Sequence, residues 1–348
     1  MIGRIHAATA GLLLVACAAT APTTAPSPSA PSRTTLASSA VPASSSPVPP
    51  PSPSPTPSPL TSAGLRDAVA GADIRVHLEE LQGIADAHGG NRATGTTGFD
   101  ASVEYVASRL VAAGYEVTRQ PFTISQQASV NLLVERPGAI GDDVIMAGAH
   151  LDSVLAGPGI NDNGSGVATL LVLAQRLAEL PAPERTIRFA FWGAEEGGPF
   201  GSAVYVDALP PAERERIGAY LNLDMLGSPN FIRFVYDEPF AADGSDAITT
   251  LFADYFEDAG MAWEPIDLAG HADHGAFTSA GIPTGGLFSG GGEPKTDAQA
   301  DAFGGSAGAL ADPCSDVACD TIANLSDVAL DQLSDAAAHA IATLAELP

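Results

Sequence analysis

Acidic and histidine side chains follow three apolar segments that are typical of buried strands. These residues are His150, Asp162 on the glycine-rich loop behind it, Glu195, Glu196 and Asp224. Taken singly, a histidine at a strand end is more often structural, and adjacent glutamates are usually solvated. Parallel strands end at one edge of a sheet, however, so we expect these carboxylates to meet in one crevice. Such concentrated negative charge requires a cation, and the pattern therefore predicts a site for divalent metal ions.

Apolar runs that alternate with amphipathic segments provide the elements that would position these side chains. Strands are expected over residues 116–122, 130–135, 143–149, 186–192, 219–223, 231–236 and 283–288. Helices are expected over residues 73–88, 99–113, 166–180, 202–208, 246–259 and 327–344. This alternation predicts an α/β fold, a single three-layer domain with a central mixed, mainly parallel β-sheet flanked by helices.

Residues 1–17 have the features of a bacterial lipoprotein-type signal peptide. A weakly basic start precedes an apolar stretch that is too short to span a bilayer, and residues 14–17 are similar to a lipobox. In that reading Cys17 becomes the lipidated first residue of the mature protein; ordinary signal cleavage after a small residue is the alternative. Either process exports the protein, as a bacterial cell membrane lipoprotein that faces outward or as a secreted protein.

Residues 18–62 are almost wholly Pro, Ser, Thr and Ala, a composition that cannot bury enough apolar surface to fold. We expect a disordered linker there, followed by one catalytic domain over residues 63–348. Lipidation of Cys17 would leave Cys314 and Cys319 as a pair, which an oxidising environment outside the cytoplasm would join in a disulfide.

The charge balance argues against nucleic acid as a partner. The chain has 15 Lys and Arg residues against 41 Asp and Glu residues, and Lys295 is its only lysine. Nucleic acid phosphates need basic partners, which this composition does not supply. Membrane contact is expected only through the lipid anchor, and the protein is expected to be a monomer.

Several ordered motifs of the chain resemble those of a known family. Residues 149–153 with 160–166, then 191–196 and 221–228, are similar in type and spacing to the motifs of the M28 co-catalytic zinc aminopeptidases. The likeness is greatest to the secreted bacterial leucine-preferring type and extends from about Asp73 to the C-terminus. It includes residues 90–93, 273–277 and 285–288. The resemblance implies a zinc-exopeptidase-like fold.

The resemblance also implies a role for each of the chemistry-bearing residues. Asp162 would bridge two metal ions, His150 and Asp224 would complete the first site, and Glu196 would bind at the second. Glu195 would be the general base for a metal-bound hydroxide that attacks the scissile carbonyl. The implied function is a metallo-aminopeptidase that hydrolyses N-terminal, apolar residues from peptides with a free N-terminus.

The chain departs from the family pattern in the loop between Cys314 and Cys319. Ser315 stands where the family has a substrate-contacting tyrosine, and Asp316 stands where it has a histidine ligand. If Asp316 binds metal, all protein ligands of the second site are oxygens, which shifts its preference from Zn²⁺ toward harder ions such as Mn²⁺ or Mg²⁺. We expect Zn²⁺ at the first site and either Zn²⁺ or such a harder ion at the second. Four anionic ligands would also make the bound water less acidic, so activity should rise at higher pH. If Asp316 does not bind, the protein is a slow single-metal hydrolase or a surface-anchored peptide-binding module with an impaired second site.

The resemblance leaves three further hypotheses. His271 and Phe288 stand at positions that contact substrate in the family, although a solvated loop histidine is an equal alternative for His271. A structural calcium is bound in some relatives at positions that match Asp73, Ile74, Asp327 and Asp331; paired aspartates on a helix are otherwise usually solvated. A single-zinc glutaminyl-cyclase-like acyltransferase is the alternative enzyme, and the presence of His150 disfavours it.

Overall fold

The computed structural model describes residues 60–140 and 142–347 of the chain. The predicted signal peptide, Cys17 and the predicted linker up to residue 59 lie outside the described residues. Helix α1 (Ser62–Ala68) is not expected from the sequence; its first turn is capped by Thr61, whose hydroxyl accepts from the Gly64 backbone N–H at 3.0 Å. Leu60 is already buried. Folded structure therefore begins ahead of residue 63, where we expect the catalytic domain to start.

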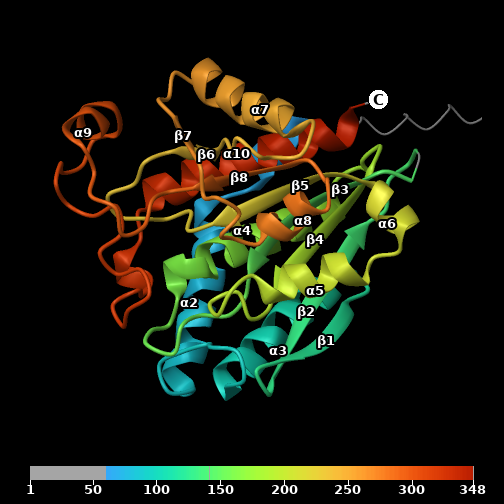
Figure 1. The fold of residues 1–348 in the computed structure, drawn as a ribbon, viewed down its shortest axis with the longest axis horizontal. Helices are drawn as coiled ribbons and strands as arrows, with labels where there is room; N and C mark the ends of the chain where they lie inside the picture. The colour runs from blue at the N-terminus through green and yellow to red at the C-terminus, as the bar shows by residue number, and fades with distance from the viewer. Residues whose placement is uncertain (1–59, 141, 348) are drawn as a thin grey trace, which may run out of the picture. The chain divides into compact units, whose positions relative to one another are not determined.

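A single mixed sheet forms the centre of the described part of the chain, with the strand order β1-β2-β4-β3-β5-β8-β6-β7 (Figure 1). The parallel central strands are β4 (Thr186–Trp192), β3 (Val144–His150), β5 (Ile217–Asp224) and β8 (Thr284–Phe288). On one side lie the antiparallel strands β2 (Gln127–Arg136) and β1 (Thr118–Ile124). On the other side β6 (Phe234–Tyr236) is antiparallel to β8 and parallel to β7 (Glu264–Ile266). The predicted fold class is confirmed.

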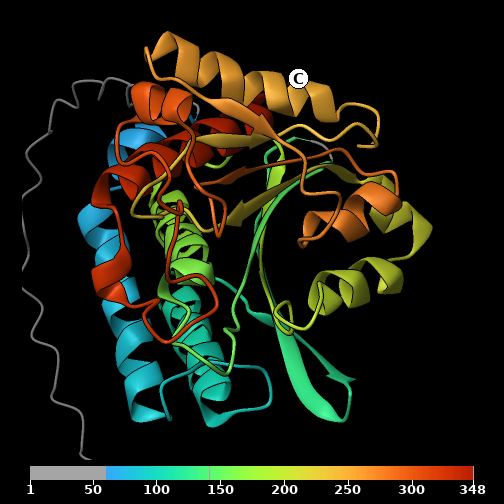
Figure 2. The same ribbon diagram turned by 60° about the vertical axis from the view of Figure 1, so that its left-hand side comes forward.

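Helices cover both faces of this sheet. The bounds of those that the structure describes, besides α1, are α2 (Gly71–Ala87), α3 (Thr97–Ala112), α4 (Gly166–Glu179), α5 (Phe200–Ala208), α6 (Pro211–Glu215), α7 (Ser245–Asp258), α8 (His274–Ser279), α9 (Asp297–Phe303) and α10 (Asp327–Glu346). Figure 2 shows α2, α3, α4 and α10 on one face of the sheet and α5 and α8 on the other. Two short helical turns, η1 (Ile160–Ser165) and η2 (Ile322–Asn324), lie in loops. No helix in the described ranges combines the length and the apolar character needed to span a bilayer.

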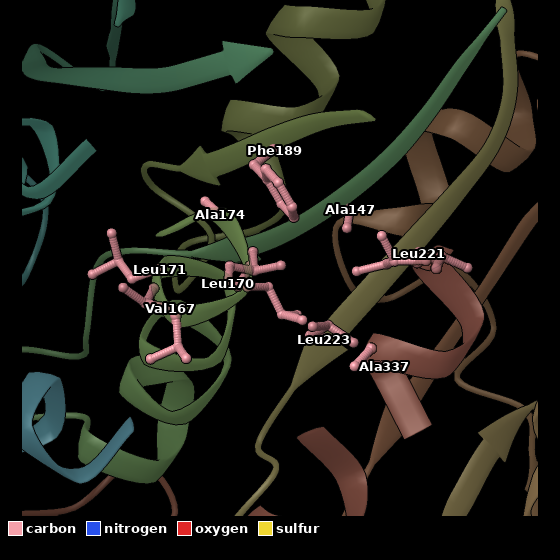
Figure 3. Packing of buried hydrophobic residues seen from close by; sticks show 14 of the residues in the cluster. Ala147, Val167, Leu170, Leu171, Ala174, Phe189, Leu221, Leu223 and Ala337 are labelled. Carbon is pink, nitrogen blue, oxygen red and sulfur yellow. The ribbon is translucent and has the colours of Figure 1, made fainter. Parts of the chain in front are cut away.

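The larger core lies between the sheet and the face that carries α4 and α10. Leu170 of α4, Phe189 of β4 and Leu221 of β5 meet there with no exposed surface (Figure 3). A fully buried side chain of this kind contributes about 1.5–3 kcal/mol to stability. The opposite face has a smaller, aromatic core, in which Trp192 of β4 and Tyr220 of β5 pack against Phe277 of α8. Burial on both faces explains why β3 is a continuous apolar run up to His150, and why β4 is apolar apart from Thr186 and Arg188 rather than strictly alternating.

Candidate metal centre

The first group of chemistry-bearing residues lies where β3 and β5 end. His150 is the last residue of β3, Asp224 is the last residue of β5, and Asp162 lies in η1. His150 Nε2 is 3.1 Å from Asp162 Oδ1 and 3.5 Å from Asp224 Oδ1. One ligating atom from each of the three residues lies within 4.8 Å of the others, which is a geometry that could hold a metal ion. The predicted convergence of strand ends therefore occurs.

A second group shares Asp162 with the first. Asp162, Glu196 and Asp316 also bring one carboxylate oxygen each within 4.8 Å of one another. Glu196 follows β4, and Asp316 lies in the loop closed by the Cys314–Cys319 disulfide, which is formed. The structure thus places Asp316 beside the other two carboxylates, as the ligation hypothesis requires.

The electrostatics of the two groups fit bound cations. Burial, together with the neighbouring acidic groups, raises the pKa of Glu195 to about 9 and that of Glu196 to about 10. Burial lowers the pKa of His150, but the carboxylates of Asp162 and Asp224 outweigh it and raise that pKa well above its usual value. Glu196 Oε1 is buried without a hydrogen-bond partner. A divalent ion would satisfy that oxygen and offset the crowding of like charges.

Asp152 is a site residue for which the sequence analysis assigns no role. It is buried, and its carboxylate accepts hydrogen bonds from the backbone N–H groups of Glu195 (3.0 Å) and Glu196 (3.4 Å). His150 Nδ1 lies 3.2 Å from the Asp152 backbone carbonyl oxygen. Asp152 therefore fixes the loop that presents both glutamates. The sequence could have suggested this role, because Asp152 lies two residues after His150 within residues 149–153, one of the segments that resemble the family motifs.

Arg92 is a second residue whose role the sequence does not reveal. Its side chain is fully buried and donates to the backbone carbonyls of Pro158 (2.9 Å), Gly159 (2.6 Å) and Leu151. These carbonyls belong to the loop between β3 and η1, so Arg92 holds the segment that joins His150 to Asp162. Only its place in the segment 90–93 of the resemblance could have suggested it.

The disulfide loop packs directly on the glycine-rich loop. Asp320, which follows Cys319, accepts hydrogen bonds from the backbone N–H groups of Asn161 (2.8 Å) and Asp162 (2.9 Å). A Cβ added to Gly157 would lie 2.3 Å from the Val317 carbonyl oxygen, so only glycine permits this approach. The two loops that carry Asp162 and Asp316 are thus positioned against each other by backbone contacts.

Residues 131–341, more than half of the chain, match the sequence profile of Peptidase family M28. The chain belongs to this family. A leupeptin-inactivating enzyme 1 of Streptomyces exfoliatus is 45% identical over 243 residues, which cover 69% of this chain and 54% of the relative. A protein named as a probable lipoprotein aminopeptidase of Mycobacterium tuberculosis is 41% identical over 233 residues, which cover 61% of this chain and 47% of the relative. The chain spans about half the length of these curated relatives.

A solved structure of an aminopeptidase from Aneurinibacillus sp. strain AM-1 has the same fold. It superposes with a TM-score of 0.69, covers 83% of this chain and 97% of its own, and is 17% identical in sequence. At that identity the superposition shows that this M28 chain has the fold of a solved aminopeptidase, and no more.

The structure leaves the predicted substrate contacts of this M28 chain less defined than its metal groups. Phe288 ends β8 and is half-buried, with its ring centroid 6.1 Å from that of Phe234. Ser315 is half-buried beside Asp316, whereas His271 is exposed. His274, its neighbour in sequence, is buried and pairs with Glu238 at 2.7 Å, so it is not free to replace a missing ligand. The roles of His271, Phe288 and Ser315 stay predictions.

The predicted calcium residues Asp73 and Asp327 each take part in an ion pair in the structure. Asp73 pairs with Arg176 at 2.5 Å and Asp327 pairs with Arg75 at 2.6 Å. Ile74 lies inside α2, where its carbonyl belongs to the intrahelical hydrogen-bond pattern. Within the described ranges, neither these two aspartates nor Asp331 belongs to a group of three close acidic or histidine ligands. The calcium site stays a prediction for which the geometry gives no support.

Proposed function

We propose that the chain is a metal-dependent aminopeptidase that hydrolyses N-terminal, apolar residues from peptides. The observation that carries the proposal is the pair of ligand groups that share Asp162, with Glu195 beside them. Glu195 Oε2 lies 4.0 Å from His150 Nε2, which places a carboxylate at the first group without making it a member. Membership of the M28 family supports the same function.

The first site would be formed by His150, Asp162 and Asp224, and the second by Asp162, Glu196 and Asp316. The first set contains an imidazole nitrogen and suits Zn²⁺. The second contains only carboxylate oxygens, which suit Zn²⁺ less well than nitrogen or sulfur and favour a harder ion such as Mn²⁺. We therefore infer two divalent ions per chain, of which the second is the more readily exchanged.

Ions held at these sites would polarise the scissile carbonyl and acidify a water molecule. Glu195, whose Oε2 lies 4.0 Å from His150 Nε2, would accept a proton from that water and deliver it to the leaving amine. The acidic surroundings also suit the ammonium group of a free peptide N-terminus, which restricts cleavage to the first peptide bond. The Asp152 carboxylate would keep the glutamate loop in place during this proton transfer.

One assay tests the proposal against its alternatives. The purified protein is stripped of metal with a chelator, reloaded separately with Zn²⁺, Mn²⁺ or Ca²⁺, and supplied with a leucine anilide or its N-blocked form. We expect turnover of the free anilide only, with Zn²⁺ or Mn²⁺. Equal cleavage of the blocked substrate contradicts an aminopeptidase, and no turnover with any ion favours a binding module. Formation of a cyclised product from an N-terminal glutamine peptide would favour the cyclase-like acyltransferase.

We also propose that Cys17 anchors the exported protein to the outer side of the bacterial cell membrane. The lipobox-like residues 14–17 and the relative named as a probable lipoprotein aminopeptidase support this assignment. A Cys17→Ala variant should move from the membrane fraction to the soluble fraction of expressing cells. Equal distribution of the wild type and the variant would favour a secreted protein.

A further inference from the structure

A cavity with no role in the proposed chemistry lies beside the second ligand group. Its volume is about 350 Å³, and both Asp152 and Glu196 belong to its wall. Glu196 is a member of the second metal group, and Asp152 accepts from the backbone of Glu195 and Glu196. The cavity therefore borders the second ligand group.

Part of the cavity wall lies at the edge of the sheet where β3, β4 and β5 end, which is also the edge that carries the two ligand groups. Strand β2 runs antiparallel to β4, with Leu132 opposite Phe191, so β2 begins at the edge where β4 ends. The turn that joins β1 to β2 lies there, and it contributes Ile124 and Gln127 to the wall. The loop after β3 contributes Leu155. The cavity thus lies on the β2 side of the metal groups.

The direction of a bound peptide follows from the same strand order. Phe288, the predicted contact for the N-terminal side chain, ends β8, and the order along the edge is β2-β4-β3-β5-β8. A peptide whose first residue lies near Phe288 and whose carbonyl lies between the metal groups would continue toward β4 and β2. We propose, on the basis of the proposed function, that the cavity binds the side chain of the second residue of the substrate, on the leaving side of the scissile bond.

The chemistry of the wall selects an apolar, uncharged side chain. Ile124, Val154, Leu155 and Phe200 provide apolar surface, and none of the lining residues is Lys or Arg. Residue Leu155 is 70% exposed, so it is available for contact with a ligand. The Asp152 carboxylate is already occupied by two backbone N–H groups. An acidic second residue would find no basic partner, whereas an apolar one would cover exposed Leu155.

Three amide substrates separate this proposal from the function on which it rests. Leucine amide has no second residue, Leu-Gly-amide has one without a side chain, and Leu-Leu-amide has an apolar one. For the metal-loaded wild type we expect kcat/KM for Leu-Leu-amide to exceed that for Leu-Gly-amide about tenfold. Leu155→Ala should reduce that ratio severalfold and leave the rate with leucine amide unchanged. A Val111→Ala variant, which removes another exposed apolar side chain on α3, is the matched control and should change neither.

A gain of function makes the test independent of lost stability. Leu155→Asp places a carboxylate in the cavity wall and should raise the ratio of Leu-Lys-amide to Leu-Leu-amide cleavage at least about tenfold. Cleavage of leucine amide without discrimination among the longer amides, in the wild type or the Leu155 variants, would overturn the subsite alone. Failure to cleave leucine amide with any metal would overturn the proposed function, and the subsite with it.

Discussion

The backbone N–H of Asp162 donates to the carboxylate of Asp320 at 2.9 Å, although the two residues are 158 positions apart in sequence. Asp162 belongs to both ligand groups, and Asp320 follows the disulfide that closes the loop of Asp316. This hydrogen bond therefore couples the shared ligand of the two groups to the loop that carries the unusual ligand of the second.

Replacement of Asp320 should weaken the second site more than the first. Asp320→Ala removes the carboxylate that accepts from two backbone N–H groups of the Asp162 loop. The Asp162 loop and the disulfide loop would then no longer be fixed in position relative to each other. We expect the affinity for the second ion to fall about 10–100-fold, the usual effect of losing a residue that orients a ligand. Metal titration calorimetry measures this, and Asp320→Asn, which keeps one carbonyl acceptor, is the control. Equal losses at both sites would contradict the specific coupling.

The exchange Asp316→His restores a nitrogen ligand at the second site. We expect the variant to retain Zn²⁺ more tightly and to show higher zinc-supported activity at neutral pH, because imidazole suits Zn²⁺ and leaves the bound water more acidic. Asp316→Ala should hold one ion per chain by elemental analysis. If both variants match the wild type in metal content and metal dependence, Asp316 is not a ligand.

Glu195→Gln should separate proton transfer from metal binding. The amide keeps the shape of the side chain but cannot act as a base, so we expect kcat to fall about 10²–10⁴-fold. Elemental analysis should find an unchanged metal content, because Glu195 is not a member of either ligand group. Glu104→Gln, on the exposed ion pair with Arg119, is a matched control that should keep full activity. A loss of metal in Glu195→Gln would assign Glu195 to coordination instead.

Metal-free protein should become less stable as the pH rises. Burial raises the folded-state pKa of Glu195 to about 9 and that of Glu196 to about 10, whereas both pKa values are near 4.5 in the unfolded chain. The folded state therefore holds more protons between pH 5 and pH 9, and stability falls as the pH rises through that window. Thermal melting in chelator should show Tm decreasing by several degrees from pH 6 to pH 9, and bound Zn²⁺ should flatten the profile. Parallel profiles with and without metal would contradict this account.

The predicted calcium site at the ends of the domain can be tested by its effect on thermal stability. If Asp73, Asp327 and Asp331 bind calcium, the ion should raise the Tm of the wild type and have no effect on Asp327→Ala. Asp297→Ala changes another aspartate in the first turn of a helix and is the control. An equal response in all three proteins would leave the ion pairs with Arg75 and Arg176 as the whole role of Asp327 and Asp73.

The sequence predicts the centre of the fold better than its periphery. Strand β3 is an apolar run up to His150, and β4 is apolar except for Thr186 and Arg188, because both faces of these strands are buried. Helices α4 and α10 are long and rich in apolar residues because they pack on one face of the sheet. Helix α9 buries none of its residues, so it leaves no periodic signal, and the three-residue strand β7 contains Pro265. The strand predicted over residues 231–236 is shorter, since only Phe234–Tyr236 form the regular strand β6 of the sheet.

The residues of the candidate metal centre also differ in how well the sequence predicts them. His150 and Asp224 can be predicted because strand ends converge, and this depends only on the α/β pattern. Asp316 is placed by its resemblance to a family position, because nothing local marks an exposed aspartate between two cysteines as a ligand. Arg92 and Asp152 act through backbone groups that are far away in sequence, such as the Gly159 carbonyl, and no local pattern encodes those contacts.

The two ligand groups also differ in where their members lie along the chain. His150, Asp162 and Asp224 have all been synthesised once residue 224 is added, whereas the second group waits for residue 316, which lies in the loop that the Cys314–Cys319 disulfide closes. A chain that ends anywhere in the segment 225–315 contains one complete group and lacks the other. Binding of a second metal ion would therefore require a longer part of the polypeptide than binding of the first.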